Sequence, residues 1–358
     1  MGLLIRVQPE VNGARLRRVG GGTTACLALG LFCVLLSGAA CQRSTLPRAM
    51  SDREFWRLVE TLSEPPGAFT LSDNLVSNEP RFAERIRWLH PTGGVYVGVG
   101  PEQNFSYIAR LRPALAFVID IRRENRNLHL LYKALFELSV DRPDFVSRLF
   151  SRPRPPDLEA AASVDAIFTR YDRVAPSREL YAKNRMLVRE RLLAVRGFPL
   201  SEVDLEEIDR ALSAFYQDGP EIHFWGSRTE ETAPLSYRLL MTARDSTGRS
   251  RSYLATPEGF RFVKDLHSKN RIVPVVGDFG GPSALRRMGE YVREHADVIH
   301  AFYGSNVGVY LTKQQMRAFC GNLATLPVAR PALFIENNGM RSFASKLRAC
   351  EIASRPLE

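Results

Sequence analysis

Glycines and an acid stand where the first two apolar runs of the sequence end. The run Gly94–Gly100, GVYVGVG, includes Gly98 and Gly100, and the run Ala114–Ile121, ALAFVIDI, places Asp120 near its end. Such glycines let a backbone approach a bound molecule, and the N-terminus of a following helix favours negative groups. An acid about 20 residues after a glycine turn can accept hydrogen bonds from ribose hydroxyls. The 22 residues from Gly98 to Asp120 therefore favour a nucleoside site.

Three later apolar runs also end on polar residues. Arg271–Val276 is followed by Asp278, Asp297–Phe302 by Tyr303, Ser305 and Asn306, and Ala332–Ile335 by Glu336 and Asn337. Ligands of open α/β sheets bind outside the carboxyl ends of the strands. The succession of polar strand ends therefore predicts one site at one edge of the sheet.

This order of residues resembles the class I S-adenosylmethionine-dependent methyltransferase fold, over residues 70–150 and 265–340. In that family a glycine-rich turn passes the methionine part of the cofactor, an acid after the second strand binds the ribose, and a turn after the third flanks the adenine. The resemblance implies cofactor-binding roles for Gly98, Gly100, Glu102, Asn104, Asp120 and Asp278. It implies that Tyr303, Ser305 and Asn306 face the methyl acceptor as the catalytic residues.

The sequence departs from that family at several positions. Tyr96 stands where the family usually has an acid, and Glu102 stands at the third glycine position. The segment after the fourth strand is not the Asn/Asp-Pro-Pro-aromatic motif of amino-group methyltransferases. The resemblance therefore supports the fold more strongly than the activity, and the missing third glycine also disfavours binding of NAD.

The N-terminus predicts export. Residues 25–40, ACLALGLFCVLLSGAA, form an apolar run of 16 that follows three arginines and ends in small residues before Cys41. That succession is typical of a secretory signal, and a membrane-spanning helix needs about 20 residues. The end resembles a bacterial lipobox, with Gly38 where Leu is preferred, which implies lipidation of Cys41. A plain signal cleaved after Ala40 and an uncleaved anchor are the alternatives.

Only two of the five cysteines lie in the body of the chain. Cys26, Cys33 and Cys41 belong to the N-terminal segment, which leaves Cys320 and Cys350. The segments that hold these two flank the last predicted strand, and in an oxidising compartment they could form one disulfide. Two buried free thiols are the alternative.

The elements that position these residues predict an α/β fold. We expect a Rossmann-like, mostly parallel sheet with helices on both faces and a helical insertion. The expected divisions are a signal peptide over 1–41, a tether and N-terminal helix over 42–69, the first half of the sheet domain over 70–150, a mainly helical cap over 151–264, and the second half with a C-terminal tail over 265–358.

Two groups outside the strand ends have both a functional and a structural interpretation. His223, Phe224 and Trp225 would form an aromatic ligand wall or part of the core. The polar stretch Asp73–Glu79 would be a loop over the site or ordinary turn and cap chemistry. His90, His295 and His300 do not pair with Cys or acids at metal-ligand spacing, so no metal is expected.

Composition limits the function classes. Lys plus Arg is 49 and Asp plus Glu is 39, and the excess of +10 is spread without a basic block. It fits attraction to anionic surfaces better than specific nucleic-acid binding. The expected partners are therefore a membrane, through the lipid anchor in the cell envelope, and a nucleoside-like small molecule.

Three functions remain open from the sequence: an exported lipoprotein with a methyltransferase-like fold, an active S-adenosylmethionine-dependent methyltransferase, and a surface ligand- or partner-binding protein that reuses the fold. The signals conflict, because export removes the body from the cytoplasm, where that cofactor is expected.

Overall fold

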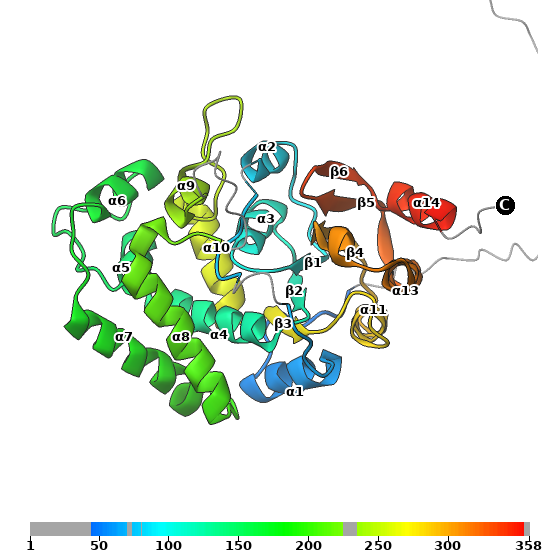
Figure 1. The fold of residues 1–358 in the computed structure, drawn as a ribbon, viewed down its shortest axis with the longest axis horizontal. Coiled ribbons are helices and arrows are strands. Elements are labelled where there is room, and N and C mark those ends of the chain that lie inside the picture. Colours follow the sequence, from blue (N-terminus) through cyan, green and yellow to red (C-terminus); the bar gives the residue numbers. More distant parts are fainter. Residues whose placement is uncertain (1–43, 70–73, 80, 225–234, 354–358) are drawn as a thin grey trace, which may run out of the picture. The chain divides into compact units, whose positions relative to one another are not determined.

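The apolar runs form one sheet. In a computed structural model, which describes residues 44–69, 74–79, 81–224 and 235–353, the sheet has the order β3-β2-β1-β4-β5-β6 (Figure 1). The strands are β1 Val95–Val99, β2 Leu115–Asp120, β3 Ile272–Val276, β4 Ile299–Ser305, β5 Val328–Glu336 and β6 Gly339–Ser342. The pairs β3–β2, β2–β1, β1–β4 and β4–β5 are parallel, and β6 is antiparallel to β5. The expected Rossmann-like α/β sheet is confirmed.

Helices cover both faces of the sheet, which explains why every residue of β2 is buried. One face carries α3 Gln103–Leu111, α4 Arg123–Leu138 and α10 Pro257–Ser268, with the short α2 Phe82–Arg87 beside α3. The other carries α1 Asp52–Leu62, α11 Ala284–Glu294 and α13 Lys313–Ala324, with α14 Phe343–Ala353 beside α13 (Figure 1). The short α12 Val307–Tyr310 follows β4.

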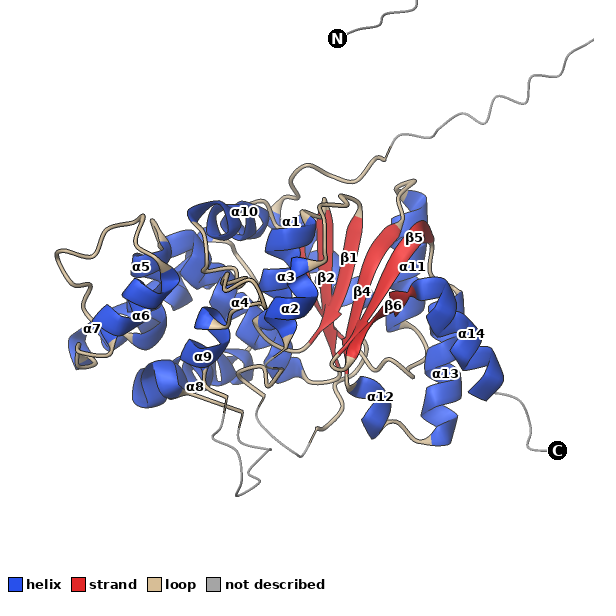
Figure 2. Cartoon of the chain, turned by 90° about the horizontal axis from the view of Figure 1, so that it is seen from above, coloured by secondary structure: helices blue, strands red, loops and turns tan. Residues whose placement is uncertain are grey.

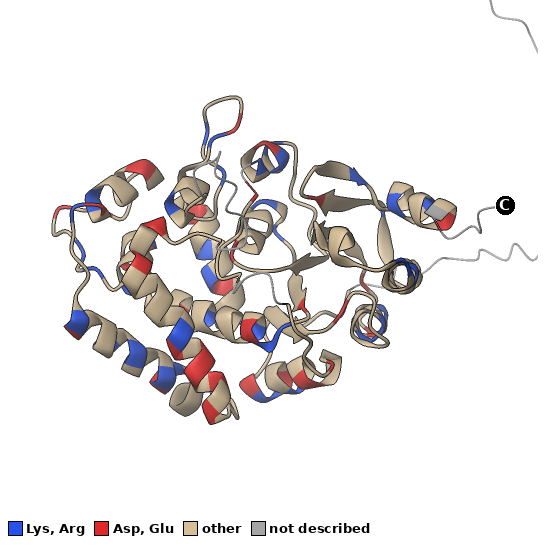
Figure 3. Cartoon of the chain, viewed as in Figure 1, with Lys and Arg blue, Asp and Glu red and all other residues tan. Residues whose placement is uncertain are grey.

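A helical region lies beside α4. It contains α5 Arg142–Phe150, α6 Val164–Tyr171, α7 Arg178–Glu190, the π-helix Arg191–Val195, α8 Glu202–Asp218, the 3₁₀ turn Gly219–Glu221 and α9 Tyr237–Thr242. Acids of α8 pair with arginines of α4: Asp204 with Arg126, and Glu207 with Arg123 at 3.1 Å. Figure 3 shows several acidic residues along α8, which lies beside α4. The expected end of the cap at residue 264 is wrong, because α10 crosses it and packs on α3 and α4.

One expected strand boundary also changes. The sequence predicts the fourth strand over Asp297–Phe302, but pairing with β5 carries β4 on to Ser305, so Tyr303 and Ser305 lie within the strand. Within the expected tether and N-terminal helix over 42–69, the chain is already bonded to the sheet domain at Thr45. The Thr45 amide donates to the carbonyl of His295 at 2.9 Å, and a capping box at Ser51 starts α1 at Asp52.

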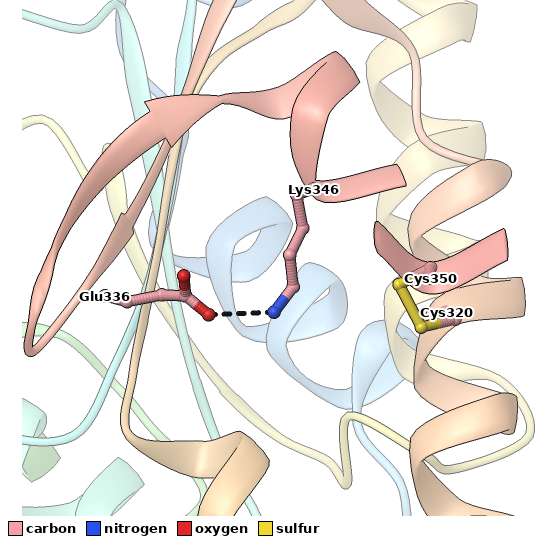
Figure 4. The surroundings of a disulfide bond; sticks show 4 residues. All are labelled: Cys320, Glu336, Lys346 and Cys350. Atoms are coloured by element: carbon pink, nitrogen blue, oxygen red, sulfur yellow. Dashed lines mark hydrogen bonds and ion pairs between the residues drawn. A yellow bond between two sulfur atoms is a disulfide. The ribbon is translucent and has the colours of Figure 1, made fainter. Parts of the chain in front are cut away.

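A disulfide joins the last two helices. Cys320 of α13 and Cys350 of α14 are bonded, and the Lys346 ammonium lies 2.8 Å from Glu336 of β5 on the same side (Figure 4). The bond therefore ties the C-terminal helix to the rest of the sheet domain. Cys26, Cys33 and Cys41 lie outside the described residues.

Replacing Cys320 and Cys350 together by Ala should lower the free energy of unfolding by about 3–4 kcal/mol in the chain-entropy model, because the bond closes a loop of 30 residues. Denaturant unfolding of the wild type and the double variant measures this. Alkylation of the unfolded, unreduced chain followed by mass spectrometry is the control. Two alkylated thiols at these positions would contradict the pairing.

Candidate functional site

A cavity lies at the carboxyl edge of the sheet, where the strand order reverses between β1 and β4. It encloses about 230 Å³. Its walls come from the ends of β1, β2 and β4, the turn after β3, α12 and the segments around Phe69 and Asn74–Glu79. Of the predicted residues it is lined by Gly100, Asp120, Asp278, Tyr303, Ser305 and Asn306. This edge, at a topological switch point, is where open α/β sheets bind ligands.

The glycine turn is only partly available to a ligand. Gly100 lines the cavity with a φ of +76°, and the nearest atom to a Cβ placed at this position would be the Asn74 amide nitrogen at 3.9 Å. At Gly98, in contrast, a Cβ would lie 1.9 Å from Oδ1 of Asn104. The prediction that Gly98 leaves room for a cofactor is therefore wrong, because Asn104 already fills that space.

Asn104 holds the turn rather than lining the cavity. Its amide nitrogen donates to the carbonyls of Val99, Gly100 and Pro101 at 2.9, 3.1 and 2.8 Å. Nε2 of the buried His129 lies 2.9 Å from the Gly100 carbonyl, and burial lowers the pKa of this imidazole to about 4, so the neutral ring donates there. These contacts fix the turn from behind, and the cofactor-binding role predicted for Asn104 is corrected to a positioning role.

Asp120 lines the cavity as predicted, but its carboxylate already has a partner. The Arg122 side chain donates from Nε to Oδ1 and from Nη2 to Oδ2, both at 3.0 Å, and the Arg122 amide also donates to Oδ1 at 3.0 Å. Both side chains are nearly fully buried. A carboxylate has about four acceptor positions, so these three bonds leave one for a ligand.

The third strand end is positioned by a residue that the sequence does not reveal. Oδ1 of Asp278 accepts from the Gly280 amide at 2.9 Å. Glu64 accepts from the amides of Asp278, Ser283 and Ala284 at 3.2, 2.6 and 2.7 Å, which holds the turn and the start of α11. Glu64 lies far from Asp278 in the sequence, so no local signal pairs them.

A buried network around Glu79 forms the base of the cavity below β4. The Glu79 carboxylate accepts hydrogen bonds from Tyr303 at 2.8 Å, from Gln103 at 3.1 Å, and from the Arg85 guanidinium and the Ser305 hydroxyl. Burial raises the pKa of the Tyr303 hydroxyl well above its usual range, so this phenol stays protonated and acts as a donor. The sequence marks Glu79 only as part of a polar stretch, and the side chains that gather on it come from α2, α3 and β4.

Part of the cavity wall is aromatic. Phe69 and Tyr310 meet edge to face at 5.1 Å, and Phe224 also lines the cavity. The Asn306 amide donates to the Tyr310 hydroxyl at 3.3 Å. Phe224 thus supports the ligand-wall interpretation of its segment, whereas Trp225 lies outside the described residues.

Glu102 does not line the cavity, which corrects its predicted contact with a cofactor. Its side chain is fully buried, and both carboxylate oxygens accept from the Ser77 amide at 3.2 and 3.3 Å. Burial raises the pKa of Glu102 from 4.5 to about 7. Glu102 therefore holds the Asn74–Glu79 segment, whose residues do line the cavity.

Glu102→Gln should stabilise the protein relative to wild type at pH 8 but not at pH 5. The folded state holds the Glu102 proton more tightly than the unfolded chain, so wild-type stability falls as the pH rises from about 4.5 to 7. The shift corresponds to about 3 kcal/mol at most. Urea unfolding at both pH values measures the difference, with the exposed Glu206→Gln as the control. If the free energy of unfolding depends on pH equally in Glu102→Gln and in the wild type, the pKa of Glu102 is not raised in the folded protein.

Within the described ranges, no group of three or more His, Cys, Asp or Glu side chains has a metal-binding arrangement. A family model described as Domain of unknown function (DUF7790) matches residues 74–197 and 207–349. No curated protein matches the sequence. The matched ranges include β1 to β6 and most residues of the cavity.

Proposed function

Since the chain belongs to the DUF7790 family, a domain of unknown function, we propose from its own geometry that it binds a nucleoside-type ligand of the S-adenosylmethionine class in the strand-end cavity. One observation carries the proposal. Gly100, Asp120, Asp278 and Tyr303, which lie at or near the carboxyl ends of four different parallel strands, line the same cavity at the point where the strand order reverses.

The chemistry of the walls suits such a ligand. Asp120 keeps an acceptor position for a sugar hydroxyl, and Gly100 leaves its backbone accessible. The aromatic rings of Phe69, Phe224 and Tyr310 offer apolar surface for a base. A ligand that combines a planar base with a hydroxylated sugar would use both kinds of wall.

Calorimetric titration with S-adenosylhomocysteine, adenosine and adenine tests the proposal. We expect heat from the first two and weaker binding of adenine, because adenine lacks the sugar hydroxyl that Asp120 would accept. The Gly100→Val variant, whose side chain would enter the cavity, should lose binding of all three. Absence of heat from the wild type with each compound would contradict the proposal.

Methyl transfer is the second candidate, and Ser305 favours it. Ser305 has a φ of +47°, a left-handed conformation that costs a non-glycine residue of order 1–3 kcal/mol and is concentrated at functional sites. It directs a hydroxyl to Glu79 beside Tyr303 and Asn306, on the side that would face a methyl acceptor. Methyl transfer needs mainly the positioning of an acceptor. Incubation with methyl-labelled S-adenosylmethionine and detection of S-adenosylhomocysteine above the level of Ser305→Ala tests it.

We further propose that the body is exported and anchored by lipid on Cys41, which lies outside the described residues. The arginines, the apolar run and the small residues before Cys41 support this. Every helix in the described part of the chain is too short or too polar to cross a membrane. Stable anchoring needs more than one acyl chain, and the diacylated or triacylated cysteine of a lipoprotein would supply them.

Cys41→Ala should remove the body from the membrane fraction of expressing cells or leave an unprocessed precursor of larger size. Cys33→Ala, within the apolar run, is the matched control and should fractionate as wild type does. Mass spectrometry of the N-terminal peptide identifies the acyl chains. A Cys41→Ala variant of unchanged size that stays in the membrane would contradict the anchor.

A further inference from the structure

The start of the described chain lies at the edge of the sheet opposite the cavity. Thr45 is bonded to His295, which precedes β4, and the Met50 amide donates to the carbonyl of Lys269, which precedes β3, at 3.1 Å. Residues 45–50 therefore run along the amino edge of the parallel strands. In Figure 2 the loops that lead into the strands lie opposite α12, which borders the cavity.

The link from the proposed anchor to this edge is short. Cys41 precedes Thr45 by four residues, which extend at most about 14 Å. The seven residues of β4 alone span about 20 Å from the amino edge to the carboxyl edge. A lipid on Cys41 would therefore hold the amino edge, and not the cavity, close to the bilayer.

Side chains of the amino edge fit an anionic membrane surface. Arg48, Arg112 and Arg330 are exposed, and none of the three makes an ion pair with any residue that the structure describes. Asp265, an acid of the same edge, is already paired with Lys269 and Arg271. Exposed arginines next to an anionic bilayer are attracted to its negative surface potential.

We propose that this amino-edge surface, formed by Arg48, Arg112 and Arg330, docks on the anionic lipid bilayer to which the chain is anchored. The cavity then opens away from the membrane and takes a water-soluble ligand rather than a membrane lipid. The proposal rests on the lipid anchor at Cys41 and deepens the proposed function by assigning the source of the ligand.

Two labelled single-cysteine positions test the orientation in the full-length lipidated protein, purified from membranes and reconstituted into vesicles that contain phosphatidylglycerol. Thr92→Cys lies on the amino edge, and Val309→Cys lies on α12 at the opposite edge, with 79% exposure. Both carry an environment-sensitive fluorophore. We expect a spin-labelled lipid to quench the label at position 92 at least twofold more than the label at 309, and aqueous iodide to show the reverse order.

A charge comparison identifies what the surface recognises. Arg48→Gln, Arg112→Gln and Arg330→Gln together should lower lipid quenching at position 92, as should phosphatidylcholine vesicles. The matched triple variant Arg178→Gln, Lys183→Gln and Arg185→Gln, on the exposed side of α7, should leave it unchanged. If the chains float with the vesicles but the lipid quenches position 309 as strongly as position 92, or more strongly, the orientation is wrong and the anchor stands. The same conclusion follows if a second copy of the protein covers position 92 and shields it from the spin-labelled lipid. Chains that do not float overturn the anchor and the orientation with it.

Discussion

Glu79→Ala should lower the free energy of unfolding by about 3–5 kcal/mol, the usual cost of removing one partner of a buried ion pair. Arg85 has a side chain only 8% exposed and would keep its charge without the carboxylate. Tyr303, Gln103 and Ser305 would lose their acceptor at the same time. Denaturant unfolding measures the effect. Because two of these donors line the cavity, ligand affinity should also fall.

An exposed pair provides the control. Glu258 bonds to Arg261 at 2.9 Å on the surface of α10, where both side chains are more than 60% exposed. Glu258→Ala should cost about 1 kcal/mol or less, since exposed ion pairs contribute little. Equal losses from the two substitutions would contradict the view that the Glu79 network holds the base of the cavity together.

The strand ends of the sheet were predictable from the sequence because buried parallel strands read as apolar runs. That pattern placed Asp120 and Asp278 at one edge without knowledge of their partners. The prediction from this pattern was wrong where the size of a neighbouring side chain decides whether a ligand fits beside the strand. A glycine leaves space either for a ligand or for a neighbouring side chain, and at Gly98 that neighbour is Asn104.

The residues that position the site could not be found from local patterns. Glu64 bonds to the turn after β3 across more than 200 residues of sequence, and Tyr303 and Ser305 of β4 reach Glu79 over a similar separation. Such pairs follow from the sheet order, which the sequence does not specify. Arg122 is the exception, because an arginine two residues after a strand-end acid is visible in the sequence as a candidate partner.

That partner changes what is expected of Asp120. A lone acid at a strand end would be replaceable without harm to the fold, but Asp120→Ala should lower the free energy of unfolding by about 3–5 kcal/mol, because Arg122 is only 5% exposed and would lose the carboxylate that balances its charge. A loss of ligand binding in Asp120→Ala therefore does not show whether Asp120 binds the ligand or only stabilises the fold. The less disruptive Asp120→Asn and Arg122→Met variants do separate these two roles.

Both variants should be less stable than the wild type, but their ligand affinities should differ. Asp120→Asn removes a charged acceptor, a loss of about 1.5–3 kcal/mol, and should weaken S-adenosylhomocysteine roughly ten- to hundredfold. Arg122→Met releases the acceptor positions that Arg122 now occupies, so affinity should be kept or should rise. Calorimetric titration at a temperature where both variants are folded measures this. Equal losses in the two would mean that the pair only stabilises the strand end and that no sugar hydroxyl binds to Asp120.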